Sequence, residues 1–427
     1  MTDLVADLRW RDLIHQTTDD SALAHWLQAA PRTVYAGFDP TADSLHVGHF
    51  IPLLMLRRFQ RAGHSPIAVM GGATGMIGDP SGRSEERNLL SVDVLRANVS
   101  AIEQQVARVL DFSPGKAQAR VVNNYDWTHP FGVLEFLRDV GKNFPVGMML
   151  AKDSVKSRLG REDTGLSFTE FSYMLLQAYD FVHLNRTFGC ELQVGGSDQW
   201  GNITAGIDLA RRMHGAQLHG MTCPLLLKSD GTKMGKSAAG AVWLSAARTS
   251  PYQFYQYWIN VEDADIGNCL RVLTEIAHDE IEALDAARAS APGERASQRR
   301  LAQWLTQLLH GDAGVAAAQK ATAIFFGADI DALSDAELGD IFADVPSREL
   351  PRATLEAGLL AADAFVEAGL AKSKSDARRT IEQGGAYVNN RRVGAADERL
   401  GRGHLASESV MVLRSGKKKY ALLRFGA

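Results

Sequence analysis

The sequence predicts an α/β fold: a Rossmann-like parallel-sheet domain, then a helical domain, then a small α+β domain. Strand patterns at residues 33–39 and 65–72 flank a helical pattern at residues 46–63, which together predict a βαβ unit. Beyond Pro251 the apolar residues repeat at helical spacing and strand patterns become scarce. Residues 373–427 return to a pattern of a helix, a strand and a hairpin.

The βαβ unit indicates a parallel sheet covered by helices, and such sheets bind ligands at the carboxyl ends of their strands. Further strands are predicted at "ARVVNNYDW", "ELQVGG" and "MTCPLLL", with long helical patterns between them. The predicted boundaries are 1–225 for the Rossmann-like domain, 226–250 for a loop region, 251–326 for the helical domain, 327–352 for an acidic linker with some helix, and 353–427 for the small basic domain.

The charge of the chain is unevenly distributed. Its 427 residues have a net charge of −4, but residues 370–427 hold thirteen Lys and Arg against five Asp and Glu, which is +8 there and −12 over the rest. A basic module on an acidic body favours a ligand with a phosphate backbone. The alternative is a solvated basic surface that binds nothing.

The cysteine content and the apolar runs predict where the protein works. Cys190, Cys223 and Cys269 are far apart and form no CxxC pair, so neither a disulfide framework nor a zinc site is predicted. The densest apolar run, "FIPLLML", is too short to cross a bilayer. We expect a cytoplasmic protein without a membrane span.

The first motif is "HVGH" at residues 46–49, directly after the first strand of the βαβ unit. A helix that begins there presents unpaired N–H groups and a partial positive charge, which suit a phosphate. His46 and His49 would add imidazole donors, and Gly48 would let a flat base approach the backbone. A metal-binding histidine pair is the alternative, but no third ligand of suitable spacing is evident. A chance occurrence of the motif is the other alternative.

The second motif is "SDGTKMGKSAAG", which follows the apolar segment "CPLLL". A P-loop would require glycine at position 230, where the chain has Asp230, so that interpretation fails. A mobile loop with Lys233 and Lys236 could instead stabilise the charge that develops on a departing pyrophosphate. A solvated basic turn is the alternative.

A third pattern lies in "SFTEFSYMLLQAYDFVHL". Tyr173, Gln177 and Asp180 are spaced to share one face of a helix that is otherwise apolar. If that face points outward, the helix is an ordinary amphipathic one. If it points inward, the Asp180 carboxylate needs a hydrogen-bond donor, which a ligand hydroxyl would supply.

Taken together and in this order, "HVGH" and "KMGKS" resemble the HIGH and KMSKS signatures of class I aminoacyl-tRNA synthetases. With "YAGFDPTADSLHVGH", "GGATGMIGDPSG", "TEFSYMLLQAYDF" and "VGGSDQWGNITAG", the resemblance extends over most of residues 33–237 and is to the bacterial tyrosyl-tRNA synthetases. The sequence departs from the family at Val47, at Gly235 and at Ala36. Many relatives have cysteine at that last position, where it reaches the ribose, so one modest contact is expected to be absent here.

The resemblance implies a role for each matching residue. For the tyrosine substrate, Tyr35 and Asp180 would bind the phenol, Gln199 would lie near the carboxylate, and the rest of the pocket would comprise Asp79, Asn124, Tyr173 and Gln177. For ATP, the implied contacts are Asp39, Thr41, His46, Gly48, His49, Gly196 and Asp198. Around the pyrophosphate, the implied catalytic residues are Arg83, Arg87, Lys233, Lys236 and Ser237.

The tail sequence "SKSDARRTIEQGGAYVNNRRV" resembles the small RNA-binding fold that a ribosomal protein shares with bacterial tyrosyl-tRNA synthetases. Its implied RNA contacts are Arg378 and Arg379, with Lys417, Lys418 and Lys419 at the tip of the hairpin. A solubilising helix and turn is the alternative.

The resemblance implies an enzyme that charges tRNA with tyrosine in two steps, with ATP as a substrate, Mg²⁺ arriving with ATP, no tightly bound cofactor, and a homodimer as the assembly. A tryptophan-specific synthetase is one alternative, against which the pair Tyr35 and Asp180 argues, because an indole N–H only donates. A non-catalytic RNA-binding relative is the other.

Overall fold

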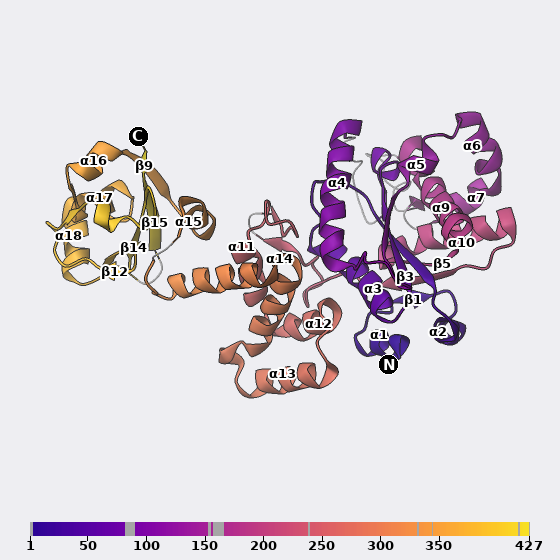
Figure 1. Cartoon of the computed structure of the whole chain (residues 1–427), viewed down its shortest axis with the longest axis horizontal. Coiled ribbons are helices and arrows are strands. Elements are labelled where there is room, and N and C mark those ends of the chain that lie inside the picture. Colours follow the sequence, from indigo (N-terminus) through magenta and orange to yellow (C-terminus); the bar gives the residue numbers. More distant parts are fainter. Residues whose placement is uncertain are drawn as a thin grey trace. The chain divides into compact units, whose positions relative to one another are not determined.

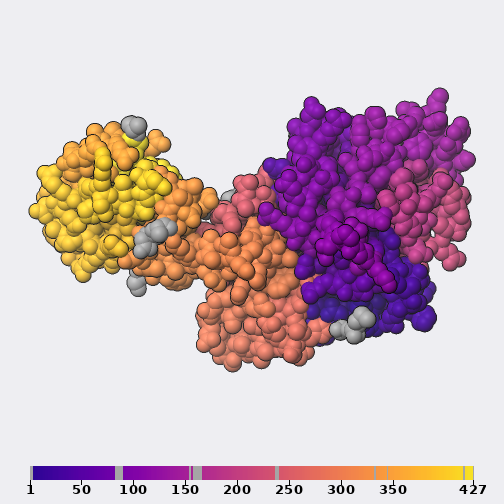
Figure 2. Space-filling view, viewed as in Figure 1, coloured from indigo at the N-terminus to yellow at the C-terminus, as the bar shows by residue number. Residues whose placement is uncertain are grey.

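The protein is described here by a computed structural model that covers residues 3–81, 90–152, 155–156, 166–237, 240–330, 333–343, 345–416 and 419–426, with the backbone alone for residues 236 and 237. The chain forms two compact units: residues 1–249 with 257–309, and residues 250–256 with 310–427. Figure 1 shows the elements of each unit and Figure 2 shows their packed surfaces on one face. In the described ranges, no helix is long and apolar enough to cross a membrane.

A six-stranded sheet forms the centre of the first unit, and its strand order is β1-β6-β5-β2-β3-β4. All neighbouring strands are parallel except β1, which pairs antiparallel with β6 at one edge. The strands are β1 (Gln16–Thr17), β2 (Thr33–Phe38), β3 (Ser65–Met70), β4 (Arg120–Asn123), β5 (Cys190–Gly196) and β6 (His219–Cys223). The predicted α/β fold with a parallel sheet is confirmed.

The strand order reverses at β2, because β3 and β4 lie on one side of it and β5 and β6 lie on the other. A reversal of this kind leaves a crevice at the carboxyl ends of the strands, where doubly wound sheets bind their ligands. Asp39 follows β2 directly, and Ser197 follows β5. The topology therefore brings "HVGH" and "VGGSDQW" to one edge of the sheet.

Helices surround this sheet in Figure 1. They are α1 (Leu4–Trp10), α2 (Asp20–Ala29), α3 (Phe50–Arg61), α4 (Val92–Val109), α5 (Tyr125–Thr128), α6 (Val133–Asp139), α7 (Val146–Leu150), α9 (Phe168–Phe188) and α10 (Trp200–His214). The strand-poor region that follows contains α11 (Pro251–Ile259), α12 (Asp263–Leu273), α13 (His278–Ser290) and α14 (Ala296–Phe325). Helix α14 is interrupted at Gly311, whose φ is 68°.

Two strand predictions ended too late, for local physical reasons. "ARVVNNYDW" is a strand only to Asn123, because α5 begins at Tyr125. "MTCPLLL" is a strand only to Cys223, since Pro224 has no N–H to continue a ladder. Helix α3 also starts later than predicted: Val47–His49 is a 3₁₀ turn and the α-helix begins at Phe50.

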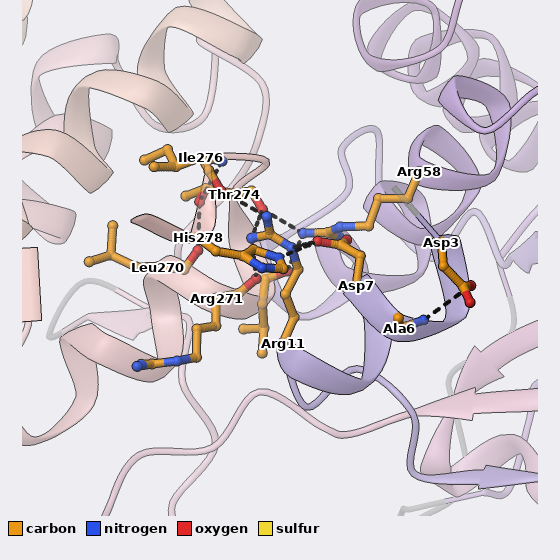
Figure 3. A network of polar contacts seen from close by, with 11 residues as sticks. Asp3, Ala6, Asp7, Arg11, Arg58, Leu270, Arg271, Thr274, Ile276 and His278 are labelled. Atoms are coloured by element: carbon orange, nitrogen blue, oxygen red, sulfur yellow. Dashed lines mark hydrogen bonds and ion pairs between the residues drawn. The ribbon is translucent and has the colours of Figure 1, made fainter. Parts of the chain in front are cut away.

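Buried arginines attach α12 to the sheet domain (Figure 3). Arg11 of α1 donates to the carbonyls of Arg271, Thr274 and Ile276 at 3.3, 3.1 and 2.7 Å. Arg58 of α3 donates to the Thr274 carbonyl at 2.7 Å and to that of Val272 at 3.1 Å. The last turn of a helix has carbonyls without intrahelical partners, so cationic donors there satisfy groups that would otherwise be buried unpaired. The C-terminal end of α12 is therefore held against α1 and α3.

The second unit contains a five-stranded sheet of order β12-β11-β14-β15-β9. Its strands are β9 (Ser347–Pro351), β11 (Ala386–Val388), β12 (Arg391–Arg392), β14 (Val410–Ser415) and β15 (Lys419–Gly426), and its helices are α15 (Asp335–Ile341), α16 (Arg352–Glu356), α17 (Ala361–Glu367) and α18 (Lys374–Glu382). A second, two-stranded sheet pairs β10 (Leu359–Leu360) with β13 (Arg399–Leu400). Residues 327–352, predicted as a linker with some helix, contain α15 and also β9, which pairs parallel with β15.

Candidate active site

A buried carboxylate, that of Asp180, lies at the centre of the site. Helix α9 carries it, and its side chain is only 4% exposed. One oxygen accepts from Asn124 Nδ2 at 3.0 Å and the other from Trp127 Nε1 at 2.8 Å. Burial raises its pKa to about 7; the two hydrogen bonds oppose this effect and the charge of Asp39 adds to it. The face of α9 that carries Tyr173 and Asp180 thus points inward.

The Tyr35 hydroxyl lies in the same apolar environment. Tyr35 is on β2, is 1% exposed, and packs edge-on against Phe181 with ring centroids 5.1 Å apart. Its hydroxyl has no hydrogen-bond partner among the described residues. Burial raises the pKa of this phenol well above its usual value, and the charge of Asp180 raises it further. A buried hydroxyl without a partner beside a buried carboxylate is the arrangement that a polar ligand would complete.

A chain of hydrogen bonds leads from Asp180 towards the end of β2. Asn124 also donates to Thr74 Oγ1 at 3.0 Å, and Thr74 donates to Asp39 Oδ1 at 2.7 Å. The second oxygen of Asp39 accepts from the Tyr173 hydroxyl at 3.0 Å. Side chains from the segments that follow β2, β3 and β4 and from α9 therefore fix one another through hydrogen bonds.

A second polar cluster surrounds Asp79, which is 8% exposed. Gln199 donates to Asp79 Oδ2 at 2.7 Å and accepts from Gln177 at 3.2 Å. Asn202 of α10 also donates to Gln199, at 3.2 Å. Two carboxylates, Asp79 and Asp39, thus share one edge of the sheet with several amides, which suits a ligand that carries an ammonium group.

The "HVGH" segment forms a tight turn with stacked imidazoles. The rings of His46 and His49 are 3.9 Å apart at an interplanar angle of 20°, and Gly48 N donates to His46 Nδ1 at 3.0 Å. A Cβ on Gly48 would lie 2.8 Å from His46 Cε1. A side chain at position 48 would therefore displace the His46 ring from this arrangement, a reason for glycine that the sequence did not suggest.

The "KMGKS" loop is joined to this turn through the backbone. Gly235 O accepts from Val242 N at 2.8 Å, and Val242 O accepts from Val47 N at 3.0 Å. A Cβ on Gly235, whose φ is +96°, would lie 3.1 Å from Val47 Cβ. Two motifs almost two hundred residues apart in sequence therefore lie in contact.

The charges around Asp198 connect the loop with the Asp79 cluster. Partial removal from water raises the pKa of the Asp198 carboxyl, the charge of Asp79 raises it further, and the charge of Lys233 lowers it. A Cβ on Gly196 would lie 2.7 Å from an Asp198 oxygen, so glycine leaves room for this carboxylate.

Thr41, which follows β2, is exposed, and its N–H donates to Asp39 O at 2.9 Å.

The described side chains at this site do not include every residue with a predicted role. Arg83, Arg87, Lys417 and Lys418 are outside the described residues, and Lys236 and Ser237 are described by backbone alone, as strand β7. Arg378 and Arg379 are exposed on α18, and exposed Lys419 begins β15, so these three belong to the second unit.

Sequence reasoning missed Trp127, Thr74 and Asn202. Trp127 follows Asn124 by three residues on the short helix α5, so the pair faces one way. This three-residue spacing is a usable signal for a shared helix face, but the strand predicted over "ARVVNNYDW" obscures it. Thr74 lies within a quoted motif, yet nothing in its spacing distinguishes it from the small residues around it.

A doubly wound parallel sheet whose switch point carries an HxGH turn, in contact with a KMxKS-type loop, defines the class I aminoacyl-tRNA synthetases. The family described as class I tRNA synthetases (W and Y) matches residues 28–327, and the tyrosine–tRNA ligase SYY-like C-terminal domain matches residues 337–423. The chain belongs to the tyrosine–tRNA ligase family.

Individual relatives agree with this assignment. The chain is 59% identical to a tyrosine–tRNA ligase of Rhodopirellula baltica over 99% of this chain and 96% of that protein. It is 52% identical to one of Roseiflexus castenholzii over 99% and 100%. A solved structure, the C-terminally truncated mitochondrial tyrosyl-tRNA synthetase of Aspergillus nidulans, is similar with a TM-score of 0.69 at 30% identity, over 76% of this chain and 94% of that one.

The raised pKa of Asp180 predicts a pH dependence of stability. Between the unfolded-state pKa of about 4 and the folded-state value of about 7, the folded protein binds the extra proton, so the free energy of unfolding falls as pH rises. We expect Asp180→Asn to remove this decline, whose slope approaches about 1.4 kcal/mol per pH unit. Urea unfolding of the wild type and the variant from pH 5 to 8 measures it.

The matched control for this measurement is Asp93→Asn, at a side chain that is 96% exposed. It should follow the wild-type curve. A constant difference between wild type and Asp180→Asn across this range would mean that Asp180 does not titrate there.

Proposed function

We propose that the chain activates L-tyrosine with ATP to give tyrosyl-adenylate and pyrophosphate, and then transfers tyrosine to the 3′-terminal adenosine of its tRNA. One observation carries the choice of amino acid: the Tyr35 hydroxyl and the Asp180 carboxylate share one buried, apolar environment. A phenol can donate to the carboxylate and accept from the Tyr35 hydroxyl. Phenylalanine would leave the Tyr35 hydroxyl unpaired and would give the buried Asp180 carboxylate no donor beyond Asn124 and Trp127; tyrosyl-tRNA synthetases are the standard illustration of this effect.

In the proposed complex, the rest of the tyrosine lies along the polar clusters already described. Asp79, Tyr173 and Gln177 hold the ammonium group, Asn124 keeps Asp180 oriented, and Gln199 lies near the carboxylate. These side chains fix one another through hydrogen bonds. The substrate would therefore bind to groups that need little reorganisation.

ATP is proposed to lie against the "HVGH" turn. Thr41 and His46 contact the terminal phosphate, Gly48 the adenine, and His49 and Asp198 the ribose, with Asp39 and Gly196 completing the site. Gly48 is exposed, so the backbone there is accessible to a flat base. Mg²⁺ enters bound to the phosphate oxygens, which are the hard ligands it prefers.

The first step is an in-line displacement. A tyrosine carboxylate oxygen forms a bond to the α-phosphorus while the bond from that phosphorus to the bridging oxygen of pyrophosphate breaks, and pyrophosphate leaves with the electron pair. Lys233, Lys236 and Ser237, with Arg83 and Arg87, stabilise the charge on the departing group. In the second step a ribose hydroxyl of the tRNA attacks the acyl carbon and AMP leaves.

The second unit is proposed to bind tRNA. Arg378 and Arg379 are exposed on α18, and Lys419 is exposed at the start of β15. Arg379 also pairs with Asp376 at 2.7 Å, so its guanidinium is held near the surface of α18. The net charge of +8 over residues 370–427 suits the RNA backbone, which such modules recognise by shape and charge.

The assembly is proposed to be a cytoplasmic homodimer. Large apolar side chains are exposed on three helices of the first unit, with Leu134 82% exposed. They are Val133, Leu134 and Leu137 on α6, Val146 and Leu150 on α7, and Phe168 at the start of α9. An exposed apolar patch marks an interaction site, and a second copy of the chain is the proposed partner.

Pyrophosphate exchange into ATP tests the activation step. Wild type should exchange with tyrosine and not with phenylalanine or tryptophan. Asp180→Ala should lower kcat/KM for tyrosine about 100-fold and Tyr35→Phe about tenfold, with the KM for ATP unchanged, because only the phenol contacts are lost.

The control is Asp93→Ala, at an exposed side chain, which should match wild type. Tryptophan-dependent exchange would favour the tryptophan-specific alternative, and no exchange by folded wild type would leave only an RNA-binding relative.

Charge reversal on α18 tests the tRNA contact. The double variant Arg378→Glu, Arg379→Glu should lower kcat/KM for tRNA in aminoacylation about tenfold or more. The slope of log(kcat/KM) against log salt concentration should become shallower by about two, because about two phosphate contacts are lost. Tyrosine-dependent exchange should not change, since it needs no tRNA. Arg9→Glu, at an exposed side chain of α1, is the control. Unchanged aminoacylation and an unchanged salt slope would place the RNA contacts elsewhere.

A further inference from the structure

Residues 226–235, which carry Lys233 and are called the lysine loop below, form a small hairpin with its own internal hydrogen bonds. Met234 N donates to Leu226 O at 2.9 Å, and Lys228 N donates to Thr232 O at 2.8 Å. Gly231, with φ +81°, turns the chain at the tip. The internal bonds fix the shape of the hairpin, but they do not determine where Lys233 lies relative to the rest of the site.

Two side chains from the helical region hold this hairpin from outside. Asp265, in the first turn of α12 and 6% exposed, accepts from Ser229 N at 2.7 Å. The Tyr257 hydroxyl, on α11, accepts from Gly235 N at 2.8 Å. These contacts fall on either side of Lys233, four residues before it and two after it. Between them, Met234 Sδ lies 3.5 Å from Cys269 Sγ of α12, and both side chains are buried.

Helix α12 is itself fixed at its other end. The carbonyls at and beyond its last turn accept from Arg11 and Arg58, as Figure 3 shows. Arg58 lies on α3, the helix that follows the "HVGH" turn. The lysine loop and the histidine turn are therefore both positioned relative to α3, one of them through α12.

We propose that Tyr257 and Asp265 are positioning residues that place Lys233 for the activation step. Neither reacts; each accepts a backbone N–H of the loop. This inference rests on the proposed function, because it assigns the loop a role in the transition state. If the lysines act mainly on the departing pyrophosphate, loss of either acceptor lowers kcat more than it changes the KM for tyrosine.

The test uses full-length Tyr257→Phe, Asp265→Ala and Asp265→Asn. Tyr257→Phe keeps the ring and removes the acceptor. Asp265→Asn removes the charge and keeps a carbonyl oxygen that can accept from Ser229 N, whereas Asp265→Ala removes both. Tyr252→Phe, on the same helix α11, is the matched control for loss of a hydroxyl.

We expect kcat for pyrophosphate exchange to fall about three- to tenfold in Tyr257→Phe and in Asp265→Ala, with the KM for tyrosine unchanged. Asp265→Asn should recover most of the loss, and Tyr252→Phe should match wild type. A loss in Asp265→Asn equal to that in Asp265→Ala would overturn the acceptor role. An unchanged kcat in Tyr257→Phe would overturn the role of Tyr257.

A second readout does not depend on activity. Lys233 is exposed, so limited trypsin digestion reports how firmly the loop is held. The initial rate of cleavage at Lys228 and Lys233 should rise several-fold in Tyr257→Phe and Asp265→Ala, and not in Tyr252→Phe. If wild type shows no exchange while cleavage responds in this way, the proposed function fails and the loop contacts stand. Unchanged cleavage with normal wild-type exchange overturns this inference alone.

Discussion

The structure depends on the burial of one carboxylate. Asp180 is removed from water on α9, and such a group is costly unless donors reach it. Asn124 and Trp127 supply two, from the segment after β4. Through Asn124 the network continues to Thr74 and Asp39. The hydrogen bonds that begin at the Asp180 carboxylate therefore link the ends of three strands. In the proposed complex, the substrate hydroxyl adds a further donor to this carboxylate.

The second constraint is the strand order. Because the sheet reverses at β2, the histidine turn, the Asp79 cluster and the face of α9 meet at one edge, although they are distant in sequence. The lysine loop reaches this edge through Val242, whose N–H donates to Gly235 O and whose carbonyl accepts from Val47 N, and through its contacts with α11 and α12. The proposed tyrosine site is thus built at the ends of the strands and on α9, whereas the charged loop is proposed to be placed by two side-chain acceptors. This division suits an enzyme that must recognise an amino acid first and stabilise departing charge later.

The sequence predicted much of this arrangement because several signals were local. Apolar strand patterns and 3.6-residue spacing identify β2, α3 and β3, and the spacing of Tyr173 and Asp180 predicts that they share one face of α9, although only the structure shows that this face points inward. Partners across the sheet carry a weaker signal: the spacing of Asn124 and Trp127 puts them on one side of α5, but Trp127 reaches Asp180 only because α5 begins at the end of β4. Similarly, β9 is short and mostly exposed, and its pairing with β15 joins segments about seventy residues apart, so it resembled a linker. The reason for Gly48, a clash with the His46 ring, also needs coordinates.

The central claim is that the Tyr35 hydroxyl and the Asp180 carboxylate select a phenol. The most direct measurement is the equilibrium binding of tyrosine and of phenylalanine to the wild-type protein without ATP or tRNA, by calorimetry. The account predicts that tyrosine binds and that phenylalanine gives no saturable signal over the same concentration range. Equal dissociation constants for the two amino acids would contradict it, because the buried pair would then make no contact with the para position of the ring.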